Sequence, residues 1–405
     1  MNRSPLLVIF VTVFIDLVGF GIVIPILPFY VESEQFRATP RELGLLFASY
    51  SVMQLVFTPV LGRLSDRYGR RPVLFFSIVG AGVGYVVLGA ATALWMLFVG
   101  RVVSGITGGN ISTAQAYVAD ITTPENRARG MGLFGAAFGL GFIFGPALGG
   151  LLSRFGISAP FYFAAALSFA NAALLYFTLP ETVTRDHPAR SHAAPRGWAH
   201  IFRHLASPPF ALVVLIYFLF VVSFSIMTTV FPLYTKYRFG YDPLHNGYLF
   251  AYIGVISAVI QGALIGRLVR RWGEARLVVV GAFALAVNLF VLPFVGPAAG
   301  GLLGLLGLLA AFSTGNSFAT PALTSLASKS VGASEQGGVM GLTQAAASLA
   351  RTIGPVLGGF LIYSASAPEQ IDDRSLLLTF GASAAIMFAA LLCALYYVRV
   401  VSRES

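Results

Sequence analysis

The chain has 405 residues, of which 57% are apolar and only 10% are charged, and its formal net charge is +10. A soluble domain carries about 25% charged residues, so this composition excludes a water-soluble protein and indicates one that lies in a membrane. The single cysteine, Cys393, excludes a disulfide framework and a cysteine-based metal site.

Twelve apolar segments follow one another along the chain. Each is close to the roughly 20 residues that a helix needs to cross a bilayer. The sequence therefore predicts an all-α integral membrane protein with twelve transmembrane helices. The predicted spans are 5–30, 43–62, 72–93, 94–119, 130–153, 160–179, 209–234, 246–268, 277–297, 299–327, 337–364 and 376–398.

The basic residues lie unevenly about these spans. With the N-terminus in the cytoplasm, 18 of the 26 Lys and Arg residues fall on the cytoplasmic side and six on the opposite side. Such a bias is the positive-inside signal, which fixes the orientation of a membrane protein. We therefore expect a multi-pass protein of a bacterial-type inner (plasma) membrane, with both termini cytoplasmic. The excess charge then faces anionic lipid, and no nucleic-acid partner is expected.

One long polar segment divides the spans six and six. It runs from Pro180 to Pro208 and holds four of the five histidines. Their spacing is irregular and no acid–cysteine cluster accompanies them, so no metal site is expected. The predicted domains are an N-terminal six-helix bundle (1–179), a cytoplasmic linker (180–208) and a C-terminal six-helix bundle (209–405).

The two halves repeat each other. "GRLSDRYGRRP" (Gly62 to Pro72) returns more weakly as "GRLVRRWGEAR", at a shift of 204 residues. "MGLFGAAFGLGFIFGPALGG" (Met131 to Gly150) returns as "MGLTQAAASLARTIGPVLGG", at a shift of 209. Duplicated halves are typical of secondary transporters, in which a site at mid-membrane lies between two halves that rock.

Asp16 is the one acidic residue within the predicted spans, since the other Asp and Glu residues fall in loops or at span ends. It lies about ten residues into the first span, on the order of 15 Å deep at a rise of 1.5 Å per residue. Burial at this depth disfavours the charged carboxylate, and a proton carrier needs a group of this kind. We interpret Asp16 as the proton-coupling residue. The alternative is a structural, hydrogen-bonded aspartate.

Two basic residues, Arg101 and Arg351, also lie within predicted spans. A cation at this depth is costly unless it faces water or a polar partner. For Arg351 we expect either a wet cavity, where it attracts an anionic or carbonyl-bearing substrate, or a structural hydrogen bond. Other polar residues in the spans are few, which suits an amphipathic substrate better than a sugar. The candidates for the substrate cavity are Gln54, Asn110, Gln115, Gln261, Asn316 and Arg351.

Four motifs resemble one family. "GRLSDRYGRRP" after the second span resembles the signature loop of the major facilitator superfamily, and "RVVSGITGGN" (from Arg101) resembles that family's fourth-span motif. "GLGFIFGPALGG" (from Gly139) resembles its fifth-span antiporter motif, and "DLVGFGIVIPILP" (from Asp16) the first span of its twelve-span drug/proton antiporters. Over nearly the whole chain the similarity is greatest to tetracycline-efflux proteins. The resemblance implies the major facilitator fold.

The sequence departs from tetracycline exporters at two acids. They carry an acid in the third span, where "GVGYVV" here places Gly84 beside Tyr85. They carry another in the ninth span, where "GAFALAVNLFVLPF" has none. In those proteins the acids help to bind a metal–drug cation.

The resemblance also implies roles for the motif residues. The first and fourth helices are neighbours in this fold, so Arg101 is expected to favour the charged form of Asp16 when the two are close. The signature loop is expected to form a cytoplasmic latch, with turn glycines at Gly62 and Gly69. Asp66 would dock at the N-terminus of the eleventh helix near Gly338, and Arg70 would reach Asp120. The latch residues are Gly62, Asp66, Arg67, Gly69, Arg70, Arg71 and Asp120; alternatively the arginines serve topology alone.

The fifth-span motif is expected to pack helices closely and to let them slide. Its residues, with their copies in the second half, are Gly141, Gly145, Pro146, Gly149, Gly354 and Pro355.

The function expected from these features is proton-coupled efflux of amphipathic organic compounds such as drugs. The alternatives are a facilitator or proton symporter for a small metabolite, and a lipid-translocating member of the same fold. No nucleophile–base arrangement lies within the spans, so we expect no enzyme activity and no cofactor. The expected partners are the small organic substrate, protons and membrane lipids, and the chain is expected to be a monomer.

Overall fold

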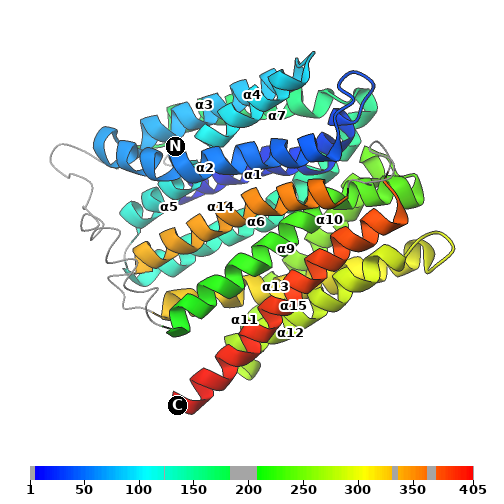
Figure 1. Cartoon of the computed structure of the whole chain (residues 1–405). Helices are drawn as coiled ribbons and strands as arrows, with labels where there is room; N and C mark the ends of the chain where they lie inside the picture. The colour runs from blue at the N-terminus through cyan, green and yellow to red at the C-terminus, as the bar shows by residue number, and fades with distance from the viewer. Residues whose placement is uncertain (1–4, 123, 183–207, 331–335, 363–370, 405) are drawn as a thin grey trace. The chain divides into compact units, whose positions relative to one another are not determined.

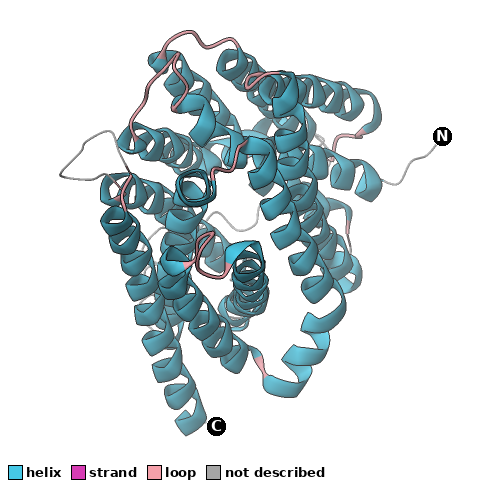
Figure 2. Cartoon of the chain, turned by 90° about the vertical axis from the view of Figure 1, so that its right-hand side faces the viewer, coloured by secondary structure: helices cyan, strands magenta, loops and turns pink. Residues whose placement is uncertain are grey.

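The structure, a computed structural model, describes residues 5–122, 124–182, 208–330, 336–362 and 371–404 (Figure 1). These residues are nearly all helical, and no strand is present among them (Figure 2). The helices are α1 (Pro5–Val31), α2 (Pro40–Tyr68), α3 (Arg70–Gly89), α4 (Leu94–Thr107), α5 (Asn110–Ile121), α6 (Pro124–Leu152), α7 (Ala159–Thr178), α9 (Pro208–Phe239), α10 (Pro243–Val259), α11 (Ile265–Trp272), α12 (Glu274–Val291), α13 (Gly301–Lys329), α14 (Gln336–Leu361) and α15 (Asp373–Glu404).

The predicted apolar segments all coincide with these helices. Ten helical segments in the described part of the chain are long and apolar enough to cross a membrane, and Gly139–Phe155 adds a shorter apolar helix. The predicted all-α membrane fold is therefore confirmed. Several predicted spans differ in detail, and the eighth is divided into α10, a π-helical turn at Ile260–Leu264 and α11. α2 continues to Tyr68 beyond the predicted end at residue 62, and the fourth span is divided into α4 and α5.

The first of two compact units contains the described residues within 1–39, 46–192 and 241–254. In it α1 packs against α6 and α7, and α3 packs against α4 and α7 (Figure 1). Its core includes Ile9, Leu17, Ile78, Tyr117 and Leu175, all buried. These residues come from the four helices α1, α3, α5 and α7, so a continuous apolar core holds the unit together.

The second unit contains the described residues within 40–45, 193–240 and 255–405. Here α9 packs against α14 and α15, and α12 packs against α13 and α15. Helix by helix, this is the packing order of the first unit, as expected from the sequence repeat. Two short segments, 40–45 and 241–254, cluster with the other half's helices. The domain division at residues 180–208 stays a prediction, and residues 183–207 of its linker lie outside the described residues.

The glycines of the fifth-span motif bring α6 into close contact with α1. A Cβ on Gly145 would lie 2.7 Å from the Gly21 Cα, and a Cβ on Gly149 would lie 2.9 Å from the Ile22 carbonyl oxygen. In the second unit Gly354 meets α9 in the same way, since its Cβ would lie 2.8 Å from the Val222 carbonyl oxygen. Small residues at these positions allow the backbones to touch.

We predict that Gly145→Leu destabilises the protein by about 1–3 kcal/mol, because the new side chain has no space against α1. Gly139→Leu is the matched control, since Gly139 lies on the same helix and a Cβ there has no atom within 4 Å. Thermal unfolding in detergent measures both. An equal loss of stability in the two variants would contradict the packing argument.

Candidate functional site

Asp16 lies in the middle of α1 and has a polar partner on α5. Its side chain is half-buried, and Asn110 donates a hydrogen bond from Nδ2 to Asp16 Oδ2 at 3.3 Å. Asn110 is 5% exposed, and its Oδ1 is buried without a hydrogen-bond partner in the described structure. The carboxylate is therefore held by a neutral donor, which carries a free acceptor at its other end.

The fourth span is interrupted beside this pair. α4 ends at Thr107 and α5 begins at Asn110, so Gly108 and Gly109 separate the two helices. α2 packs tightly on the break, since a Cβ on Gly109 would lie 2.9 Å from the Thr58 Cα. The glycines are required because there is no space for a side chain on the face toward α2.

Arg101, on α4, is 2% exposed, and its contacts are directed to α2. Its guanidinium lies over the Tyr50 ring, 4.4 Å from the centroid, and over the Phe47 ring at 5.5 Å. Its Nε also donates a long hydrogen bond of 3.4 Å to the Leu46 carbonyl. Among the described ion pairs none joins Arg101 to Asp16. The aromatic rings and the carbonyl thus provide the polar environment that a buried cation needs.

Tyr50 and Tyr85 complete the group of polar residues around Asp16 and Arg101, and the sequence motifs identified neither tyrosine. Tyr85 on α3 is 6% exposed and interacts electrostatically with Asp16, Tyr50 and Arg101. Its hydroxyl would lie 3.1 Å from a Cβ on Gly19, one turn from Asp16. The signal available in the sequence was the position of Tyr85, directly after the place of an acid in tetracycline exporters.

The cavity candidates divide between the two units. Gln54 and Asn110 belong to the Asp16 group, because Gln54 Nε2 donates to the Gly108 carbonyl at 2.9 Å. Gln115 is half-buried on α5.

In the second unit Gln261 is exposed within a π-helical turn (Ile260–Leu264) that follows α10. Asn316 accepts a hydrogen bond from Thr320 at 3.1 Å. Arg351 donates to Ser348 Oγ at 3.2 Å and interacts electrostatically with Tyr217. The role of the Gln115, Gln261, Asn316 and Arg351 side chains in a substrate cavity stays a prediction.

A second polar cluster forms at the signature loop. Arg70, 2% exposed, contacts Asp120 Oδ2 at 3.1 Å, Asp66 Oδ1 at 2.5 Å and Ser65 Oγ at 2.7 Å. The expected contact between Arg70 and Asp120 is therefore present. The sequence analysis missed Glu181, whose carboxylate accepts the backbone N–H of Arg70 at 2.9 Å.

The turn between α2 and α3 consists of Gly69 alone. Its φ of 105° favours glycine, and a Cβ would lie 2.5 Å from Glu181 Oε2. The prediction that Gly62 is a turn glycine was wrong. Gly62 lies inside α2, because the helix continues to Tyr68, and a Cβ there would meet nothing within 4 Å.

The other two latch arginines contact aromatic rings. Arg67 lies over Tyr68 at 5.3 Å, and Arg71 lies over Tyr176 at 5.0 Å and donates to its carbonyl. The Asp66 side chain is 59% exposed. Its docking near Gly338 stays a prediction, because the side chains around Gly338 lie outside the described residues.

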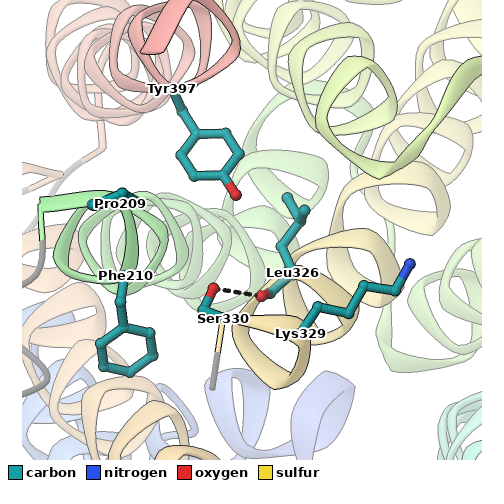
Figure 3. A pocket seen from close by; sticks show the side chains of 6 residues that line it. All are labelled: Pro209, Phe210, Leu326, Lys329, Ser330 and Tyr397. Carbon is teal, nitrogen blue, oxygen red and sulfur yellow. Dashed lines mark hydrogen bonds between the residues drawn. The ribbon is translucent and has the colours of Figure 1, made fainter. Parts of the chain in front are cut away.

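The second unit holds a counterpart of the Arg70–Asp120 pair with the charges exchanged. Glu274, 204 residues after Arg70, pairs with Lys329, 209 residues after Asp120. A small cavity of about 260 Å³ lies beside Lys329, lined also by Phe210, Leu326, Ser330 and Tyr397 (Figure 3). Lys329 is already paired and the walls come from the helix ends of one unit, so this cavity is separate from the candidate substrate residues.

Curated relatives resemble the chain over most of its length. It is 34% identical over 408 residues to the tetracycline resistance protein, class H, of Pasteurella multocida, covering 98% of this chain and 96% of the relative. It is 34% identical to the tetracycline resistance protein, class B, of Escherichia coli, covering 91% and 90%. It is 29% identical to multidrug resistance protein 2 of Bacillus subtilis (strain 168), covering 89% of each.

Solved structures share the fold. The human organic anion transporter MFSD10 (TETRAN) matches with a TM-score of 0.71 and 24% identity, covering 97% of this chain and 99% of that one. The nucleoside transporter NupG matches with a TM-score of 0.76 and 14% identity, covering 96% and 99%. The family model described as Major Facilitator Superfamily matches residues 9–355. Together with the apolar helices, these matches identify a multi-pass membrane protein that belongs to the Major Facilitator Superfamily.

Proposed function

We propose that this protein exports amphipathic organic compounds in exchange for protons. The observation that carries the proposal is the Asp16 carboxylate, half-buried at mid-helix and held by Asn110. The names of the relatives, tetracycline and multidrug resistance proteins, support export of drug-like compounds. The bias of basic residues supports a bacterial plasma membrane with both termini in the cytoplasm.

The amide of Asn110 suits both protonation states of Asp16. When the carboxyl is ionised, Nδ2 donates to it, as in the structure. When the carboxyl is protonated, its O–H becomes a donor, and the unpartnered Asn110 Oδ1 is an acceptor that a turn of the amide brings to it. Asn110 thus offers a hydrogen-bond partner to Asp16 in either protonation state, which lowers the cost of proton exchange.

Arg101 supplies the positive charge of the same group. Its field stabilises the ionised carboxylate of Asp16 and so favours release of the proton when helix movement brings the two closer. Because Arg101 is bound to α2, the distance between the cation and Asp16 depends on how α2 and α4 are placed. Alternating access thereby changes the affinity of Asp16 for its proton, which is the requirement for coupled exchange.

The substrate is an amphipathic organic molecule, on the evidence of the few amides and abundant aromatic residues of the spans. The two acids that tetracycline exporters use for a metal–drug cation are missing, so recognition here does not depend on carboxylates at those places. Arg351 instead offers a positive charge at mid-helix, fixed by Ser348. We assign it to the recognition of anionic or carbonyl-bearing groups.

The Arg70 cluster is proposed to hold the cytoplasmic latch in shape. Arg70 joins the end of α2 to the end of α5, while Glu181 binds the N-terminus of α3. Three helix ends are thus tied at one buried guanidinium. Asp66, exposed at the margin of this cluster, is the acid available for docking when the face closes.

We predict that Asp16→Asn abolishes accumulation driven by a pH gradient, because an amide does not titrate and so cannot take up and release the transported proton. Ethidium uptake into inverted vesicles, with and without an imposed gradient, measures this. Asp242→Asn is the control, since Asp242 lies before α10 and binds His245. Uptake that ignores the gradient in the wild type would favour the facilitator alternative. If ethidium uptake by Asp16→Asn responded to the pH gradient as the wild type does, Asp16 would not be the proton-coupling residue.

Arg70→Ala is expected to destabilise the protein by about 3 kcal/mol, because it leaves Asp120 and Ser65 without their buried partner. Arg63→Ala should have little effect, since Arg63 belongs to the same motif but is exposed near the end of α2. Thermal unfolding and ethidium transport, measured on both variants, separate the latch from a general effect of removing positive charge. Similar behaviour of the two variants would mean that the arginines serve topology alone.

Arg351→Gln should weaken inhibition of ethidium transport by anionic amphipathic compounds about tenfold, the effect of losing one charged hydrogen bond. Arg351→Lys should retain most of it, because the charge remains. Competition curves with an anionic and a cationic amphipathic compound measure the difference. A parallel loss for both compounds would indicate a structural role for Arg351.

A further inference from the structure

The break in the fourth span is held by two side chains of α2. Gln54 Nε2 donates to the Gly108 carbonyl at 2.9 Å and lies 3.4 Å from the Tyr50 hydroxyl. That hydroxyl packs against Gly108 itself, where a Cβ would lie 2.5 Å from it. Tyr50 and Gln54 are one helical turn apart, so they reach the break together.

The same tyrosine contacts the group on the other side of the break. Its ring lies 4.4 Å from the Arg101 guanidinium on α4, whereas Asn110, the first residue of α5, binds Asp16. Tyr50 is therefore the residue of α2 that touches both Arg101 and the break. A change in the bond between Asn110 and Asp16 acts on the start of α5, which is two residues from Gly108.

The residues of α2 are divided between the two units. Residues 40–45 cluster with the second unit, where Gly44 packs against the Pro355 carbonyl of α14. Leu46 is the first residue of α2 in the other unit, and its carbonyl is the one that accepts the Arg101 Nε hydrogen bond. The contacts of Arg101 with α2 thus extend from Tyr50 to Leu46, the first residue of α2 that clusters with the first unit.

We propose that Tyr50, together with Gln54, is a positioning residue that transmits the protonation state of Asp16 to α2. The inference rests on the proposed function in one respect, that Asp16 carries the proton. Protonation changes which end of the Asn110 amide binds Asp16, and the break in the fourth span adjusts. The Gly108 carbonyl and Arg101 then move relative to Gln54 and Tyr50, and α2 follows because it is bound to both.

Two polar side chains face Asp16 in the described structure. Tyr85 faces it from α3 and Asn110 from α5, whereas Arg101 on α4 interacts with Tyr85. α6 faces α1 through residues such as Phe144 and Gly145, which do not titrate. From α7, Asn171 donates to the Thr12 carbonyl and reaches only the backbone of α1. α5 connects the carboxyl to α2 through the break that Gln54 and Tyr50 hold. Tyr85 on α3 also interacts with both Asp16 and Tyr50, and the Phe20 ring of α1 lies 5.6 Å from the Tyr50 ring, so these connections converge on Tyr50.

Amide hydrogen exchange tests the transmission without any substrate. Asp16→Asn serves as the permanently neutral state, and exchange is compared at one pH for peptides covering 40–56 and 104–113. In the wild-type background, Asp16→Asn should change exchange in both peptides by about fivefold, the opening cost of one neutral hydrogen bond. In the Tyr50→Phe background it should change only the peptide that contains the break.

Tyr30→Phe is the matched control. Tyr30 is a buried tyrosine of the same unit whose hydroxyl donates to the Leu88 carbonyl at 3.1 Å, far along α1 from Asp16. Its removal should leave the response of residues 40–56 intact. Gln54→Met, which removes the bond to Gly108, should act as Tyr50→Phe does, and it serves as the second variant if one of them folds poorly.

Three results would overturn the proposal: no response of residues 40–56 in the wild-type background, a response preserved in both Tyr50→Phe and Gln54→Met, or a response lost equally in Tyr30→Phe. Ethidium transport into proteoliposomes with pyranine inside adds a functional arm. Tyr50→Phe should lower gradient-driven transport about fivefold and leave the ethidium Kd within about twofold. If the wild type moves neither ethidium nor protons, the proposed export fails, while the exchange result still decides the role of Tyr50.

Discussion

The hydrogen bond from Gln54 to the Gly108 carbonyl is the contact on which the polar site of the first unit depends. A helix that breaks inside a membrane exposes backbone groups, and lipid offers them no partner. Because Gln54 binds the freed carbonyl, the fourth span can change course at Gly108 and Gly109. That break places Arg101 on one helix and Asn110 on the next, so the cation that contacts α2 and the amide that binds Asp16 lie on separately movable elements.

The repeat supplies one framework to both units, but the charges are used differently. Arg70 is the first residue of α3, where the helix dipole disfavours a cation. Glu181 offsets this by accepting the first N–H groups of that helix. In the second unit the equivalent residue, Glu274, is itself an acid at the start of α12 and pairs with Lys329. An acid at the start of α12 already suits the helix dipole, whereas the arginine at the start of α3 requires the additional carboxylate of Glu181.

The sequence could predict what depends on composition or on one dominant residue. Lengths of apolar runs predicted the helices, and Asp16 was evident because no other acid lies in a span. The contacts of Tyr50 and Gln54 could not be read in this way, since a glycine pair in an apolar span is common and Gly108 is 54 residues from Gln54. Glu181 lies 111 residues from Arg70, and nothing in its neighbourhood distinguishes it from other acids at span ends. Such contacts follow from the packing of helices rather than from local pattern.

Two equivalent close contacts lie near the starts of α2 and α10, one within each unit. Gly44 at the start of α2 packs against the Pro355 carbonyl of α14, and Gly247 at the start of α10 packs against the Pro146 carbonyl of α6, where a Cβ would lie 2.7 Å away. At both glycines the nearest atoms are backbone, so the helices approach closely there and small rotations about these contacts displace few side chains. Movement at these contacts does not by itself depend on the protonation state of Asp16. On α2, Gly44 lies two residues before Leu46, whose carbonyl accepts a hydrogen bond from Arg101, so a movement of α2 is connected to a charged group. α10 has no such connection, because α13, the counterpart of α4, contains no arginine.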